Sequence, residues 1–77
     1  MKTPQYNLGD LVGTYYSGFA RVGIVTERIL VDSYVGGYTT FNYRVLIQGT
    51  ERIVIRREYE LHEPRGFLKA HGGLYGA

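Results

Sequence analysis

The residues whose type and spacing could do chemistry are four arginines in the middle of the chain: Arg44, Arg52, Arg56 and Arg57. In an extended chain Arg52 and Arg56 share one face, and Arg44 joins them if its own segment pairs alongside in the matching register. A guanidinium group donates two parallel hydrogen bonds to a phosphate. An arginine stripe on a small β domain with aromatic rings nearby therefore predicts a nucleic-acid surface.

The alternative interpretation of these arginines is a solvated sheet face on which Glu27, Glu51 and Glu58 are their partners. The formal net charge is only +2, whereas a nucleic-acid footprint is usually more basic. The charge balance favours the solvated face, so nucleic-acid binding is the second of two functional hypotheses.

The first hypothesis rests on aromatic residues: Tyr15, Tyr16, Phe19 and Tyr59. Three of them lie in the segment from Gly13 to Ala20, where glycine and serine predict an exposed loop. Exposed aromatic rings are typical of protein–protein contacts. We therefore predict a protein partner or self-association, in which a Gly-rich C-terminal tail could add to a neighbour's sheet edge.

Groups for catalysis and metal binding are sparse. The chain has no cysteine, its two histidines, His62 and His71, lie in or near the C-terminal tail, and no nucleophile motif surrounds either serine. In an extended chain Glu58, Glu60 and His62 would share a face as a three-ligand set for zinc, but no second cluster accompanies them. A charged strand edge explains them better. We predict no enzymatic activity, no metal, no cofactor and no small-molecule substrate.

The composition predicts one small globular domain. The chain has 77 residues, of which 44% are hydrophobic, and includes eleven glycines. A chain of this length buries only about 60% of its unfolded surface, so the core is small. The longest apolar runs are three residues, far from the roughly 20 that span a bilayer, and the N-terminus lacks a signal-peptide pattern. We expect a soluble cytoplasmic protein without membrane contact.

The hydrophobic pattern predicts an all-β domain. Its elements are a short strand at 8–12, a long strand at 21–35 with a bulge or sharp bend near 26–28, a hairpin turn at Gly36-Gly37, a central hairpin at 42–56, and a helical turn or short strand at 57–61. Gly23 marks a close approach by another backbone. We expect a five-stranded, partly open small barrel at 8–63, after a lead-in at 1–7 and before a flexible or docking Gly-rich tail at 64–77.

Four short motifs resemble SH3-like small barrels, including Tudor-like and KOW-like relatives. They are Gly9-Asp10-Leu11-Val12, Gly23-Ile24-Val25-Thr26-Glu27, Tyr43-Arg44-Val45-Leu46-Ile47 and Arg57-Glu58-Tyr59-Glu60-Leu61. In order and spacing the set also resembles short uncharacterised proteins of tailed bacteriophages and their hosts. The resemblance implies a five-stranded barrel that acts as a binding module, with the host cytoplasm as its location if the chain is phage-encoded.

Overall fold

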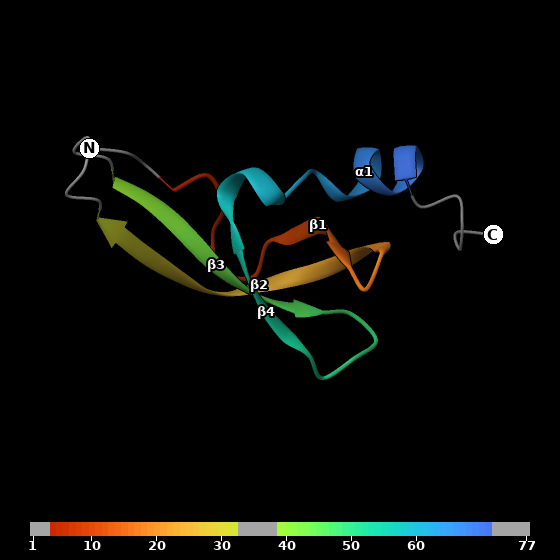
Figure 1. Ribbon diagram of the computed structural model, residues 1–77, viewed down its shortest axis with the longest axis horizontal. Coiled ribbons are helices and arrows are strands. Elements are labelled where there is room, and N and C mark those ends of the chain that lie inside the picture. The colour runs from red at the N-terminus through yellow and green to blue at the C-terminus, as the bar shows by residue number, and fades with distance from the viewer. Residues whose placement is uncertain (1–3, 33–38, 72–77) are drawn as a thin grey trace.

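The computed structural model describes residues 4–32 and 39–71 of the chain. Its elements are β1 (Leu11–Tyr16), β2 (Phe19–Asp32), β3 (Thr39–Ile47), β4 (Ile53–Arg57), the short 3₁₀ helix η1 (Glu58–Glu60) and the helix α1 (Pro64–His71). The strands form one antiparallel sheet in the order β1-β2-β3-β4 (Figure 1). The mostly β class is confirmed, and the described residues contain four strands where five were predicted. The predicted turn at Gly36-Gly37 lies outside the described residues.

The first hairpin corrects the prediction of an exposed loop between Gly13 and Ala20. β1 continues to Tyr16, and β2 begins at Phe19 directly opposite it. The two residues between them, Ser17 and Gly18, have φ angles of 52° and 82°. Left-handed conformations at both central positions are typical of the two-residue turns that match the twist of paired strands. The aromatic residues here are therefore strand residues at the end of a hairpin.

The predicted bulge in the long strand is confirmed. Val25 pairs with Val45 and Glu27 pairs with Arg44, which leaves Thr26 as an extra residue in β2. An extra residue reverses the face to which the following side chains point. This reversal explains why apolar residues of β2 occupy both faces of the sheet.

One face of the sheet carries the core. Its buried cluster consists of Val12, Val25, Tyr43, Val45, Ile47 and Leu61. The alternation of β3 predicted that 43, 45 and 47 share a face, and they do. Tyr6 also packs against this cluster, so part of the N-terminal lead-in belongs to the domain. Its hydroxyl donates a hydrogen bond to the Leu61 carbonyl oxygen at 3.1 Å.

An arginine stripe would require Arg52 and Arg56 of the β4 segment to point outward, and the structure has the opposite orientation. Ile47 donates its amide hydrogen to the Arg52 carbonyl oxygen at 2.9 Å across the turn, and this register places Val54 opposite Val45 on the core face. Ile53 and Ile55 therefore point outward, where they are 53% and 50% exposed. Both faces of β4 carry apolar residues, so the alternation alone did not decide which one is buried.

After β4 the chain returns to the other edge of the sheet. Residues 58–60 form the helical turn that was one of two predicted possibilities. Gly13 and His62 then exchange two backbone hydrogen bonds of 2.8 and 2.9 Å in an isolated antiparallel bridge. This bridge brings the C-terminal segment alongside β1, as Figure 1 shows.

Part of the predicted tail is a helix that packs on the sheet. Pro64 begins α1, a favourable place for a residue without an amide hydrogen. The Glu63 carboxylate accepts hydrogen bonds from the amides of Arg65 (3.1 Å) and Gly66 (2.7 Å), which lowers the pKa of Glu63. Phe67 is buried over Gly13. Residues 64–71 therefore dock, and residues 72–77 lie outside the described part. No described helix has the length and apolar character needed to cross a membrane.

Candidate functional site

The structure places the four candidate arginines on both faces of the sheet. Arg44 lies opposite Ile55 on the outer face, and its Nε forms an ion pair of 2.8 Å with Glu27. Arg56 lies opposite Tyr43 on the core side, where its guanidinium donates hydrogen bonds of 3.0 Å to the carbonyl oxygens of Tyr15 and Ile55. Arg44 and Arg56 therefore do not share a face, and the continuous stripe is not formed.

The other two arginines are also separated from each other. Arg52 is exposed at the end of the β3–β4 turn, in phase with Arg56. Arg57 is in phase with Arg44, and its guanidinium donates a hydrogen bond of 2.9 Å to the Tyr59 hydroxyl. Of the four residues, only Arg44 and Arg57 share the outer face.

The four aromatic residues are likewise divided between two regions. Tyr15, Tyr16 and Phe19 gather at the end of the β1–β2 hairpin, and the Tyr15 ring packs edge-on against Phe67 with centroids 5.0 Å apart. Tyr59 projects from η1 and is 71% exposed. The predicted aromatic surface is therefore two smaller surfaces, one at the hairpin end and one at η1.

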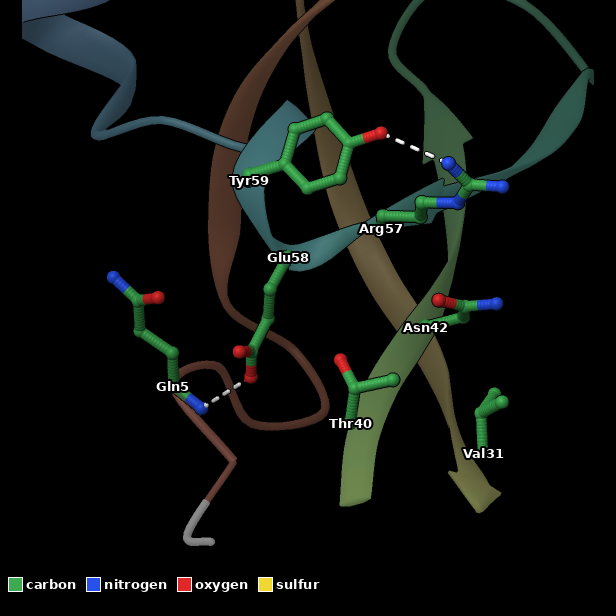
Figure 2. A pocket seen from close by; sticks show the side chains of 7 residues that line it. All are labelled: Gln5, Val31, Thr40, Asn42, Arg57, Glu58 and Tyr59. Carbon is green, nitrogen blue, oxygen red and sulfur yellow. Dashed lines mark hydrogen bonds between the residues drawn. The ribbon is translucent and has the colours of Figure 1, made fainter. Parts of the chain in front are cut away.

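Tyr59 borders an open hollow of about 510 Å³. Its lining residues are Gln5, Val31, Thr40, Asn42, Arg57, Glu58 and Tyr59 (Figure 2). The Glu58 side chain points toward Gln5, whose backbone N–H donates a hydrogen bond of 3.0 Å to the carboxylate. This carboxylate also accepts a hydrogen bond of 2.5 Å from the Tyr43 hydroxyl. These two hydrogen bonds connect Glu58 to the N-terminal segment and to β3.

Glu58 is buried, which corrects the expectation that it lies on the surface. Burial and the hydrogen bond to Glu58 raise the pKa of Tyr43 to about 12, and burial followed by the charge of Glu58 raises the pKa of Tyr6. The two tyrosine rings pack edge to face with centroids 5.5 Å apart. Together the three side chains join the N-terminal segment, β3 and η1.

Tyr43→Phe is expected to destabilise the protein by about 2 kcal/mol, because it removes a hydrogen bond to a buried carboxylate. The wild type should also lose stability from pH 10 to pH 12. The unfolded chain releases the Tyr43 proton near pH 10.0, while the folded protein retains it until about pH 12. Chemical denaturation between pH 8 and pH 12 measures both effects. The gap in unfolding free energy between wild type and variant should narrow above pH 10, and a constant gap would contradict this assignment.

The three residues that were considered as zinc ligands, Glu58, Glu60 and His62, are not brought together. Residues 58–60 are helical, so Glu58 is buried while the Glu60 carboxylate accepts the Arg57 amide at 2.8 Å. His62 stacks on Phe67 with parallel rings 4.5 Å apart. In the described part of the chain no three His, Asp or Glu side chains are grouped to hold a metal ion. A second open hollow, of about 430 Å³, is lined by Thr14, Tyr15, Arg56, Glu60 and His62.

A row of partly exposed apolar residues lies on the outer face of the sheet. Leu11 pairs with Ile24, Ile24 with Leu46, and Leu46 with Ile53, so one apolar row crosses all four strands. Leu11 is 51% exposed and Ile53 is 53% exposed, with the two inner members partly buried between them. We call these four residues the apolar row. Cross-strand neighbours on one face are in side-chain contact range.

The apolar row could not be found from the sequence. In its own strand each member stands next to a residue that packs in the core. The sequence of one strand therefore does not show which of the two faces is buried. Only the register between the strands aligns the four residues. Ile55 lies two residues beyond Ile53 on the same face and extends the surface, and the Arg44–Glu27 ion pair borders it.

Comparison with family models, with curated proteins and with solved structures finds no match for this chain.

Proposed function

We propose that this chain is a non-enzymatic protein-binding module with an SH3-like small-barrel arrangement. Three features support the arrangement: a four-stranded antiparallel meander, a 3₁₀ turn directly after β4, and a return of the chain to β1 at His62. The last feature occupies the place where a fifth strand would close the barrel. Phe67 of α1 covers the outer face at Gly13, and the apolar row on the same face keeps Leu11 and Ile53 half exposed for a partner.

The observation that carries the proposed activity is the apolar row. It forms a continuous apolar surface across four strands, and a charged pair, Arg44 and Glu27, lies beside it. An apolar centre with a polar rim is typical of protein–protein interfaces. The proposal keeps the partner class that the sequence predicted and moves the contact from the aromatic residues to the apolar row.

Nucleic-acid binding through Arg44, Arg52, Arg56 and Arg57 has less support. Arg44 is paired with Glu27, Arg56 donates to backbone carbonyls, and neither face presents all four guanidinium groups. Phosphate contacts weaken steeply as salt rises, whereas apolar contacts do not. Anisotropy titrations of labelled DNA and RNA at two salt concentrations separate the two activities, and saturable, salt-sensitive binding would favour the arginines.

Leu46→Lys should abolish partner binding, because it places a charge in the middle of the apolar row. The measurement is selection of binders from a displayed random-peptide library against the wild-type chain. The selected peptides are then titrated against each variant. We expect apolar peptides whose affinity falls at least about a hundredfold with Leu46→Lys, because a charge would have to be desolvated at the contact.

Leu30→Lys is the matched control, since Leu30 is also exposed but lies in β2 beyond the bulge, away from the apolar row. It should leave peptide affinity unchanged. Peptides that bind wild type and Leu46→Lys equally would refute the assignment of the apolar row. Circular dichroism shows whether both variants retain the sheet.

A further inference from the structure

β4 has one edge without a strand beside it. It pairs with β3 on one side, and no strand in residues 4–32 or 39–71 pairs with it on the other. Because Ile47 bonds to Arg52 and the direction of backbone groups alternates, Val54 and Arg56 face β3. The backbone groups of Ile53 and Ile55 therefore point to the open side.

The open edge has a definite length. The Arg57 amide donates to the Glu60 carboxylate at 2.8 Å, so pairing cannot extend past this residue. The Ile55 carbonyl oxygen accepts one hydrogen bond from the Arg56 side chain and has a second lone pair. The edge that remains consists of the backbone N–H and C=O groups of Ile53 and Ile55. These four groups can form four hydrogen bonds to one antiparallel strand.

Two copies of this edge segment are complementary to each other when they pair antiparallel. Ile53, Ile55 and Arg57 occupy alternate positions on the outer face of β4, and Glu51 stands two residues before Ile53 at the end of the β3–β4 turn. In an antiparallel pair of two such segments related by a two-fold axis at Val54, each Ile53 lies opposite Ile55 of the other copy. The same register places each Glu51 opposite Arg57 of the other copy. If the register shifts by two residues in either direction, one isoleucine of each copy lies opposite a charged residue of the other copy instead.

We propose that the partner is a second copy of this chain, joined antiparallel along β4 with Val54 on the two-fold axis. The proposal rests on the proposed function, because it names the protein that the module binds. The two four-stranded sheets become one sheet of eight strands, and the apolar row of each copy ends where its Ile53 lies against Ile55 of the other copy. Arg52 then lies opposite Arg56 of the other copy on the core side, and the Arg56 guanidinium is already held by the Tyr15 carbonyl.

The competing interpretation is that arginines on a short edge strand prevent pairing. This interpretation predicts a monomer, and it does not explain why Glu51 and Arg57 stand at the two ends of the segment. Residues 28–32 of β2 form another stretch of edge, but it adjoins residues 33–38, which are not described. The order of Glu51, Ile53, Ile55 and Arg57 is what favours β4.

Ile55→Pro tests the backbone pairing. The Ile55 amide hydrogen points away from β3, so proline at this position removes an edge donor and leaves the internal ladder intact. Sedimentation velocity of the wild type should show a mass that approaches two chains as concentration rises. The variant should raise the dimer dissociation constant about tenfold to a hundredfold, since each dimer loses two hydrogen bonds. Leu30→Lys should dimerise as the wild type does.

Charge exchange tests the register. Glu51→Arg alone and Arg57→Glu alone should each remain monomeric, because each opposes like charges across the axis. An equimolar mixture of the two variants should dimerise. In the mixed dimer the introduced arginine faces the introduced glutamate, and the unchanged Arg57 of one chain faces the unchanged Glu51 of the other. A monomeric wild type at every concentration, dimerisation of Ile55→Pro at wild-type affinity, or a mixture that stays monomeric would each overturn the proposal.

The two proposals fail separately. If Ile55→Pro still binds the selected peptides but the wild type is monomeric, the apolar row is a binding surface and the second copy is not its partner. If the wild type dimerises through β4 but Leu46→Lys retains peptide binding, pairing holds and the apolar row does not bind.

Discussion

Gly23→Ala is expected to destabilise the protein by about 3 kcal/mol, the upper part of the range for overpacked cores. A Cβ atom at this position would lie 2.9 Å from the Leu46 carbonyl oxygen and would overlap the buried Val45 side chain. Neither neighbour can move freely, because β3 is paired on both sides. A chain of 77 residues has a total stability of roughly 4 to 12 kcal/mol. Urea denaturation followed by circular dichroism measures the loss.

Gly66→Ala provides the matched control for Gly23→Ala. Gly66 lies in α1, where an added Cβ would meet the end of the flexible Glu63 side chain at 3.3 Å. Alanine also favours a helix over glycine by about 1 kcal/mol. We expect the control to change the unfolding free energy by less than about 1 kcal/mol. If Gly23→Ala were equally mild, the close approach of β2 and β3 would not be a constraint.

Phe67→Ala is expected to lower the free energy of unfolding by about 3 to 4 kcal/mol, as for other buried phenylalanines. The ring covers Gly13, stacks on His62 and receives the edge of Tyr15. Without it α1 has little to hold it, because an isolated helix of eight residues is marginal in water. Hydrogen exchange of the α1 amides should become fast while the β2–β3 amides stay protected.

Leu68→Ala serves as the comparison for Phe67→Ala, because Leu68 is only partly buried in the same helix. We expect this change to lower the free energy of unfolding by about 1 kcal/mol and to leave the α1 amides protected from hydrogen exchange. Equal losses from the two substitutions, or unchanged α1 protection in Phe67→Ala, would show that the helix is not anchored by the phenylalanine ring.

Features that depend on neighbouring residues could be predicted from the sequence. The central hairpin, the bulge at Thr26 and the close approach at Gly23 follow from local alternation, turn residues and residue size. The helical turn at 58–60 was one of two possibilities for that segment. The Ser17-Gly18 pair was also a local signal, and the β1–β2 hairpin could have been predicted from it.

Features that depend on distant residues could not. The helix α1 forms where Pro64 and the Gly-rich sequence predicted a tail, because Phe67 finds a site over Gly13, 54 positions away in the chain. Glu58 is buried because the Tyr43 hydroxyl and the backbone N–H of Gln5 reach it from other segments. Neither partner can be identified from the residues next to Glu58.

The sequence by itself determined that the chain is a small, mostly β domain with an alternating central hairpin. The tertiary structure decided which faces are inside. In β4 both Val54 and its isoleucine neighbours are apolar, and the observed register, with Ile47 bonded to Arg52 and Val45 paired with Val54, packs Val54 against the core. That choice separates Arg44 from Arg56 and aligns the apolar row across four strands. A shift of one residue in register would reverse both outcomes, because successive side chains of a strand point to opposite faces.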